Sequence, residues 1–217
     1  MQRLKARLDT DRYHFNKDLM AIIVIGGQSR EVGKTSVVAG LIAALPRYIW
    51  TAFKITQFGH GRCSLDGKPC TCATDDRCWA ITEEKDRNGK SDTSRFLAAG
   101  AKRSFWVRTE QGRLEEALPV LRKRIAESEN VIIESNSIVE FIEPDLYMTV
   151  LDPGLEDFKT SAERFLDRAA AVIVPESRAW QGEPGQRALR ICPPAYVTAE
   201  IVAFVNERLQ EVSIPTN

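Results

Sequence analysis

A hydrophobic segment that runs into a glycine-rich loop and then into a helical pattern is the feature that most restricts the fold of this chain. Residues 20–25 form a continuous apolar run, which is typical of a strand buried on both faces of a parallel sheet. Residues 35–45 carry apolar side chains at helical spacing. The segment between them holds Gly27, Gly33 and Lys34. Strand, loop and helix in this order predict an α/β fold that opens with a phosphate-binding loop.

The rest of the chain alternates predicted strands and helices, which indicates a mostly parallel sheet covered on both faces. We therefore expect a three-layer α/β sandwich made of one domain, residues 20–217, after a charged arm, residues 1–19. Residues 57–90 break the alternation with glycines, charges and four cysteines, so we expect a cysteine-rich insertion or long functional loop there. The expected strands are residues 49–55, 104–108, 130–134, 146–151, 170–174 and 188–192, and the expected helices are residues 93–101, 114–127, 158–168 and 198–211.

Composition and charge argue against several classes of protein. The chain has 217 residues, the length of one ordinary domain, and its 30 basic and 30 acidic side chains leave no net charge. This balance is not that of a general nucleic-acid or membrane-surface binder. No apolar run approaches the roughly 20 residues of a membrane helix, and no export signal is visible at the amino terminus. We therefore expect a cytoplasmic protein that binds neither nucleic acid nor membrane.

The loop after the first strand has the position and composition of a Walker A motif, whose backbone amides and helix end bind phosphate. Lys34 would reach the β- and γ-phosphates of ATP or GTP, and the Thr35 hydroxyl would coordinate Mg²⁺. The spacing is one residue longer than G-x-x-x-x-G-K-T, since position 28 is Gln. The alternative is a glycine-rich turn with a chance Lys-Thr pair. The expected nucleotide-binding residues are Gly27, Gln28, Ser29, Arg30, Glu31, Val32, Gly33, Lys34, Thr35 and Ser36.

A carboxylate ends the apolar strand predicted for residues 130–134. Open α/β sheets bind ligands at the carboxyl ends of their strands. Glu134 is therefore expected to bind Mg²⁺ directly or through water, as a Walker B acid. The alternative is a helix cap or a surface acid.

Two segments resemble those of known nucleotide-dependent families. Residues 27–35 resemble the phosphate loop of dethiobiotin synthetase and of the amidotransferase-type ligases of cobalamin synthesis. Residues 89–101 resemble the D-[ST]-x-R-x-x-x-A-G-A signature of the adaptor protein in molybdopterin-guanine dinucleotide synthesis. Residues 133–135 and 144–146 are more weakly similar to GTPase metallochaperones for nickel enzymes. The resemblance extends from residue 21 to about 174 and implies a P-loop NTPase fold and a homodimer.

The same resemblance implies roles for two further residues. Asp92 matches an acid that supplies another Mg²⁺ ligand in dethiobiotin synthetase, and its alternative is a plain N-cap. Lys54 lies where these families carry a lysine aimed at the phosphates or the substrate, and its alternative is a strand-end lysine that reaches solvent. The expected catalytic residues are thus Lys34, Lys54 and Glu134, and the expected Mg²⁺ ligands are Thr35, Asp92 and Glu134.

Three departures limit what the resemblance implies. Residues 175–178 do not match the Asn-Lys-x-Asp sequence with which a GTPase recognises guanine. Ser135 follows the Walker B acid where the related families have glycine, and Ser29 stands where dethiobiotin synthetase has an acid. We therefore expect neither guanine specificity nor biotin synthesis.

Four cysteines lie within sixteen residues at the spacing C-x6-C-x-C-x5-C. In a reducing compartment such a cluster is better explained as a ligand set than as a disulfide framework. Four thiolates can hold a zinc ion or a small iron–sulfur cluster. The alternatives are reactive thiols, buried unliganded thiols or an oxidised pair. The candidate ligands are Cys63, Cys70, Cys72 and Cys78.

These features predict a Mg²⁺-dependent NTPase or ATP-using transferase in cofactor or metal-centre assembly, with molybdopterin-type cofactors favoured. One alternative is a metal carrier switched by nucleotide, and another is a ligase or kinase acting on a small molecule. A weaker alternative is an adaptor that binds nucleotide and a partner enzyme but catalyses no reaction itself. The expected partners are a nucleotide, a small-molecule or metal cargo, a partner enzyme and a second copy of the chain. Lys159, which precedes a predicted helix, is expected to be a solvated lysine.

Overall fold

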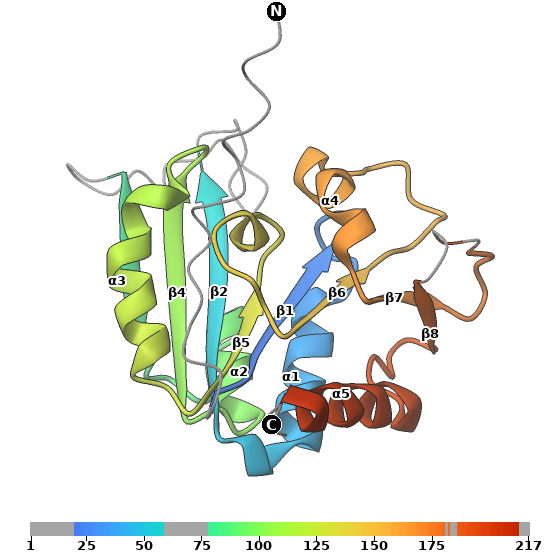
Figure 1. The fold of residues 1–217 in the computed structure, drawn as a ribbon, viewed down its shortest axis with the longest axis horizontal. Coiled ribbons are helices and arrows are strands. Elements are labelled where there is room, and N and C mark those ends of the chain that lie inside the picture. Colours follow the sequence, from blue (N-terminus) through green and yellow to red (C-terminus); the bar gives the residue numbers. More distant parts are fainter. Residues whose placement is uncertain (1–19, 59–77, 181, 183–185, 213–217) are drawn as a thin grey trace, which may run out of the picture.

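The computed structural model describes residues 20–58, 78–180, 182 and 186–212. Their strands form one sheet (Figure 1). The strands are β1 (Ile22–Gly27), β2 (Trp50–Phe58), β3 (Trp79–Glu83), β4 (Arg103–Glu110), β5 (Asn130–Glu134), β6 (Leu146–Val150), β7 (Ala171–Pro175) and β8 (Arg187–Ile191). They lie in the order β3-β4-β2-β5-β1-β6-β7-β8, and all neighbours are parallel except β3 and β4.

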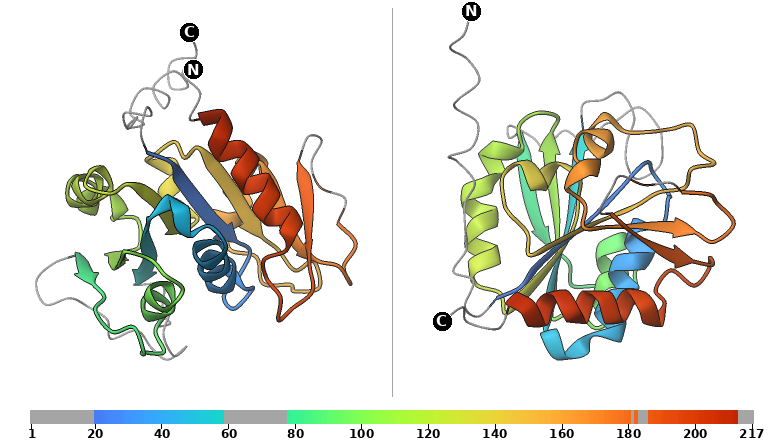
Figure 2. Two further views of the ribbon diagram at one scale, coloured as in Figure 1. Left: turned by 90° about the horizontal axis from the view of Figure 1, so that it is seen from below. Right: turned by 45° about the vertical axis from the view of Figure 1, so that its right-hand side comes forward.

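Helices cover both faces of this sheet (Figure 2). The helices are α1 (Lys34–Ala44), α2 (Asp92–Ala98), α3 (Leu114–Ala126), α4 (Thr160–Arg164) and α5 (Ala199–Val212), with short 3₁₀ turns at Pro46–Tyr48, Ser137–Glu140 and Leu166–Arg168. The largest hydrophobic core lies between the sheet and α1, α2 and α5, and a second lies between the sheet and α3. A third, small cluster consists of Leu151, Val172 and Val174. The predicted three-layer α/β sandwich is confirmed.

The alternation of side chains along β1 explains why this strand is apolar throughout. Ile23 and Ile25 pack in the core beside α1, whereas Ile22 and Val24 pack in the core beside α3. Successive side chains of a strand point to opposite faces, so a strand covered on both faces needs an apolar residue at every position. The continuous run therefore specifies a central strand.

The connections on the two sides of β1 diverge at its carboxyl end. From β1 the chain passes through α1 to β2, on one side of β1. From β5 it passes to β6, on the other side. Open α/β sheets bind ligands where neighbouring connections diverge in this way.

The sheet is larger than the sequence predicted. Residues 57 and 58 extend β2, and Trp79–Glu83 form the antiparallel edge strand β3. The segment expected as an insertion or long loop, residues 57–90, therefore contributes strand residues at 57–58 and at 79–83. All five residues of β3 are at least partly exposed, so the strand leaves little hydrophobic pattern to detect. The central part of the expected insertion, residues 59–77, lies outside the described residues.

The helix expected over residues 158–168 is also shorter than predicted. Only Thr160–Arg164 are α-helical, and a 3₁₀ turn follows at Leu166–Arg168. Ala162 is the one buried residue of α4, so this helix has too small an apolar face to continue. The other expected strands and helices lie within three residues of their predicted bounds.

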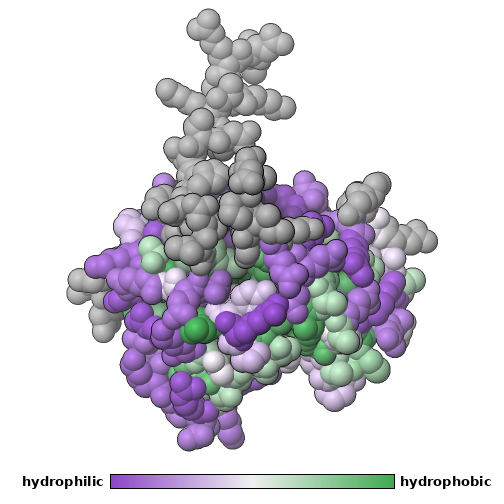
Figure 3. Space-filling model, turned by 60° about the horizontal axis from the view of Figure 1, so that its bottom comes forward, coloured by the Kyte–Doolittle hydropathy of each residue, from purple (hydrophilic) through white to green (hydrophobic). Residues whose placement is uncertain are grey.

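No helix among the described residues is long and apolar enough to cross a membrane. On the face shown in Figure 3, hydrophobic residues are interspersed with hydrophilic ones. The large hydrophobic side chains exposed in the described part of the chain are Ile49, Val120, Leu155 and Phe158.

Candidate functional site

The loop between β1 and α1 turns through two residues with positive φ, Glu31 at 57° and Gly33 at 106°. A side chain at Gly33 is excluded for two reasons. The positive φ favours glycine, and a Cβ would overlap the ring of Tyr196. Helix α1 begins at the next residue, and no side chain caps it. The amides of its first turn are thus directed toward the carboxyl edge of the sheet, as an anion site requires.

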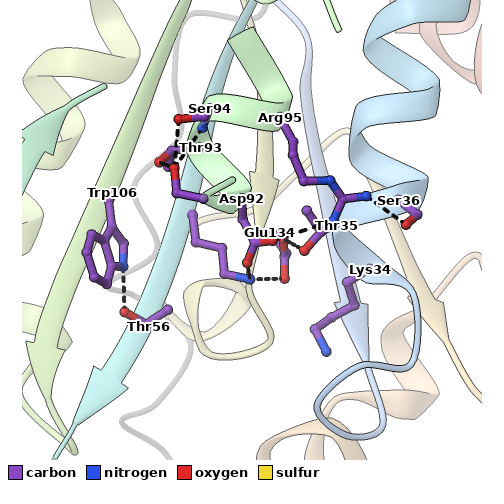
Figure 4. Close-up of polar contacts among 12 residues, drawn as sticks. Lys34, Thr35, Ser36, Thr56, Asp92, Thr93, Ser94, Arg95, Trp106 and Glu134 are labelled. Atoms are coloured by element: carbon purple, nitrogen blue, oxygen red, sulfur yellow. Dashed lines mark hydrogen bonds and ion pairs between the residues drawn. The ribbon is translucent and has the colours of Figure 1, made fainter. Parts of the chain in front are cut away.

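Strand register brings Lys54 and Glu134 together. The two residues are paired neighbours in β2 and β5, and Ala52 and Ile132, two positions earlier, pack in the core beside α1. The period of a strand therefore places both charged side chains on the face that carries α1. Lys54 Nζ lies 2.5 Å from Glu134 Oε1, and Thr35 Oγ1 donates to Glu134 Oε2 at 2.8 Å (Figure 4). Glu134 is 2% exposed, so it is not a surface acid, and its two oxygens contact side chains of Thr35 and Lys54 instead of capping a helix.

Asp92 joins this cluster from the start of α2. Its Oδ2 lies 2.7 Å from Lys54 Nζ, and its Oδ1 lies 3.7 Å from Arg95 Nη1. Arg95 also donates to Ser36 Oγ at 3.0 Å, which links α2 to α1 (Figure 4). The N-cap of α2 is Ser91, whose hydroxyl accepts a hydrogen bond from a first-turn amide. Asp92 is therefore not the N-cap of α2, which was the alternative role considered for it.

Thr35, Asp92 and Glu134 offer oxygen atoms of the type that magnesium binds. Mg²⁺ prefers oxygen ligands and is commonly held by one or two carboxylates together with substrate phosphates and water. Thr35 and Asp92 are linked through Glu134 and Lys54 in one continuous chain of contacts. The cluster thus provides the donor type and the number of carboxylates that such a site needs.

Two lysines of the site differ in how their charges are balanced. Burial opposes the charge of Lys54, but Glu134 and Asp92 outweigh it and raise its pKa above 10.5. For Lys34, burial lowers the pKa to about 8. Among the described residues Lys34 Nζ has no carboxylate partner, and it donates to the carbonyl oxygen of Ser29. Lys34 is therefore the cation whose charge a bound anion would balance.

The site opens into a cavity of about 950 Å³. Small-molecule sites span roughly 300–1,000 Å³, so this cavity is at the upper end of the range. More basic than acidic side chains line it, which favours an anionic ligand. The charged residues that line it are Arg30, Lys34, Lys54, Arg95 and Lys159 on the basic side and Glu31, Asp92 and Glu134 on the acidic side.

Six of the ten expected loop residues line the cavity, namely Arg30, Glu31, Gly33, Lys34, Thr35 and Ser36. The other four, Gly27, Gln28, Ser29 and Val32, lie outside its lining. Val32 packs into the hydrophobic core beside α1. These four residues support the shape of the loop.

Asn136, which the sequence did not single out, fixes the start of the loop. Its side-chain amide accepts a hydrogen bond from the amide of Gly27 at 2.7 Å and donates to the carbonyl of Gly27 at 3.0 Å. Gly26 has no room for a side chain, since a Cβ would lie 2.5 Å from Asn136 Oδ1 and 2.6 Å from Tyr147 Oη. The only signal was the polar run after Glu134, where the related families have glycine.

Of the clustered cysteines the structure describes only Cys78, since Cys63, Cys70 and Cys72 lie outside the described residues. The Cys78 thiol donates to Glu116 Oε2 at 2.7 Å, and this hydrogen bond raises its pKa. In the part of the chain that the structure covers, no group of three or more His, Cys, Asp or Glu residues could hold a metal ion. The zinc or iron–sulfur site stays a prediction.

Lys159 differs from expectation, because it is not a freely solvated lysine. It is half-buried and lines the cavity. Burial, Arg30 and Lys54 lower its pKa. Sequence reasoning missed its environment, which depends on the path of the segment after β6.

Glu84 orders the start of α2. Its carboxylate accepts hydrogen bonds from the hydroxyls of Ser91 and Thr93, at 2.9 and 3.0 Å, and from the amides of Lys85 and Asp86. The Asp86 amide and then the two hydroxyls hold the pKa of Glu84 at about 2, below 4.5. Glu84 thereby supports the start of α2, which carries Asp92, a predicted Mg²⁺ ligand.

We expect Glu84→Ala to lower the free energy of unfolding by about 1–2 kcal/mol at pH 7. Because folding depresses this pKa, the stabilisation is present above about pH 4.5 and is lost as the pH falls toward 2. Urea unfolding of both proteins at several pH values checks this. A difference in stability that stays constant from pH 7 to pH 2.5 would contradict it.

No protein-family model and no curated protein matches the chain. Similar solved structures include LpxK from Aquifex aeolicus in complex with ATP, at 19% identity and a TM-score of 0.46, with 79% of this chain and 53% of that chain covered. HypB from Helicobacter pylori in complex with nickel matches at 14% identity and a TM-score of 0.48, with 93% of this chain and 92% of that chain covered. The signal recognition particle 54 kDa protein from Aeropyrum pernix K1 in complex with GDP matches at 14% identity and a TM-score of 0.42, with 88% of this chain and 49% of that chain covered. The chain spans about half of the first and third structures, and none of these similarities assigns it to a family.

Proposed function

We propose that this chain is a Mg²⁺-dependent P-loop NTPase that binds ATP or GTP and cleaves the bond to the terminal phosphoryl group. The observation that carries the proposal is the partly buried Lys34, which lines the cavity at the start of α1 and has no carboxylate partner among the described residues. Removing such a charge from water is unfavourable, and a phosphate group would compensate for it. The oxygen cluster of Thr35, Asp92 and Glu134 beside it supports a magnesium-bound phosphate as the ligand.

In this proposal the loop amides and Lys34 bind the phosphates and stabilise the charge that develops on them during the reaction. Thr35, Asp92 and Glu134 would hold the magnesium ion, which when bound neutralises phosphate charge. Lys54 holds the two carboxylates in place through its ion pairs. In hydrolysis the bond from the terminal phosphorus to the bridging oxygen breaks, a water oxygen bonds to that phosphorus, and a proton is released with the diphosphate and phosphate.

For the wider role we propose the assembly of a cofactor or metal centre, with molybdopterin-type cofactors favoured. The resemblance of residues 89–101 supports this role, as does the contact between Asp92 in that segment and Lys54. The alternative of a ligase or kinase is supported by the size of the cavity, which reaches Gln57, Gln111 and Ser137 beyond the loop. A second molecule could bind there.

Phosphate release tests the proposed activity. We expect the purified chain to release phosphate from MgATP or MgGTP and to stop when EDTA removes the metal. A protein that releases phosphate from neither nucleotide, under conditions in which it is folded, would contradict the proposed activity.

Elemental analysis and metal-binding measurements test the metal-carrier alternative. The carrier hypothesis predicts about one zinc, or iron with matching sulfide, per anaerobically purified chain, with loss of that metal in Cys70→Ser/Cys72→Ser. It also predicts that metal affinity changes between nucleotide-bound and nucleotide-free protein. Chains without zinc or iron, or with equal metal affinity in both states, would exclude the carrier.

A further inference from the structure

Gln28 ties the segment after β6 to the phosphate loop. Its side-chain amide donates to the carbonyl of Leu155 at 2.8 Å and accepts from the amide of Asp152 at 2.9 Å. Its main-chain carbonyl accepts from the amide of Lys159 at 2.8 Å. Gln28 is 2% exposed, so these hydrogen bonds are shielded from water. The loop and the segment from residue 152 to 159 are therefore held together at both ends of that segment.

The side chain at the end of this segment is a third lysine in the cavity. Lys159 lines the same cavity as Lys34 and Lys54. Lys54 comes from β2, on one side of β1, whereas Lys159 follows β6, on the other side. Cations thus approach the phosphate loop from both sides of the central strand.

The charge of Lys159 is poorly balanced by the protein itself. No ion pair or side-chain hydrogen bond of Lys159 is present among the described residues, in contrast to Lys54 with its two carboxylates. Burial opposes its charge, and Arg30 and Lys54 repel it, more strongly than Asp157 and Glu134 attract it. Lys159 in turn lowers the pKa of Lys34. An arrangement that holds like charges together is unfavourable unless an anion lies between them.

We propose that Lys159 is a second phosphate-binding residue, which contacts the terminal phosphoryl group of a nucleoside triphosphate, and that Gln28 positions it. This inference rests on the proposed NTPase function. As the bond to the bridging oxygen breaks, Lys159 stabilises the charge on the terminal phosphoryl oxygens and keeps its own proton. The chain then carries within itself a cation that many nucleotide-hydrolysing proteins receive from a partner.

The binding of di- and triphosphates tests this role separately from turnover. Calorimetric titration of Lys159→Ala with MgADP should give the affinity of the unchanged protein to within about twofold. Titration with a non-hydrolysable Mg-triphosphate analogue should show an affinity lower by roughly tenfold, as expected for the loss of a charged hydrogen bond. Phosphate release should fall by about a hundredfold or more. Lys159→Arg should keep most of the preference for the triphosphate.

One further variant serves as a control, and another tests the positioning role of Gln28. Lys102→Ala removes an exposed lysine paired with Glu129 and should change neither affinity nor turnover. Gln28→Met should reduce the preference for the triphosphate, and its effect should not add to that of Lys159→Ala, because one residue acts through the other. Circular dichroism checks that Gln28→Met is folded.

The outcomes separate this inference from the proposed function. If Lys159→Ala binds the triphosphate and releases phosphate like the unchanged protein, the inference is overturned and the proposed function stays intact. Equal losses for the di- and triphosphate would also overturn it, because Lys159 would then not act at the terminal group. Absence of any nucleotide binding to the unchanged protein would overturn both.

Discussion

Lys34→Met should lower the rate of phosphate release roughly a thousandfold and leave the protein at least as stable as before. The activity falls because the variant lacks the charge that would contact the β- and γ-phosphates. The stability holds because Lys34 is partly buried and no carboxylate in the described part of the chain pairs with it, so its charge opposes folding. Methionine also keeps the apolar stem that lies over Gly27, where a Cβ would be 2.7 Å from Lys34 Cγ.

Phosphate release and thermal unfolding, measured on the same samples, check both parts of this prediction. Lys102→Met is the matched control, because Lys102 is exposed and pairs with Glu129 at the surface. It should keep its activity. Lys34→Met with full activity would remove Lys34 from the proposed mechanism, and Lys34→Met with a melting temperature far below that of the unchanged protein would show that the lysine stabilises the fold.

Glu134→Gln should lower the stability of the protein and abolish the effect of Mg²⁺ on triphosphate binding. Glu134 is buried, and its two oxygens bind Lys54 and Thr35, so the variant leaves Lys54 with Asp92 as its only ion-pair partner among the described residues. Breaking a buried pair costs about 3–5 kcal/mol, and we expect the lower end because Asp92 remains. The melting temperature should fall by about 6–12 °C. Addition of Mg²⁺ should no longer strengthen triphosphate binding.

Glu140→Gln provides the matched control for this variant. Glu140 pairs with Arg164 at the surface, where an ion pair contributes about 0–1 kcal/mol. Thermal unfolding and titrations with and without Mg²⁺ compare the two variants. If Glu134→Gln keeps the magnesium dependence of the unchanged protein, Glu134 is not a ligand of the ion.

The parts of the site that lie close together in sequence could be predicted. The apolar residues before Gly27 and the acid at the end of β5 follow from strand composition and from the position of the strand ends. The pairing of Lys54 with Glu134 depends on the register between β2 and β5, which no local pattern specifies. The strand end pointed to Glu134 and the resemblance pointed to Lys54, but neither indicated their contact.

Residues whose roles depend on contacts distant in sequence were missed or misjudged. Asn136 and Gly27 are 109 positions apart, and Gln28 and Leu155 are 127 apart. Their hydrogen bonds arise from the order of strands in the sheet, and Lys159 enters the cavity for the same reason. The edge strand β3 was missed because its residues are partly exposed on both faces.

The most direct test of the account is a calorimetric titration of the purified chain with a non-hydrolysable Mg-triphosphate analogue of ATP and with that of GTP. We predict saturable binding of at least one of them at one site per chain, weakened when EDTA removes the metal and lost in Lys34→Met. A folded chain that binds neither analogue would contradict the assignment of the loop between β1 and α1 as a nucleotide site.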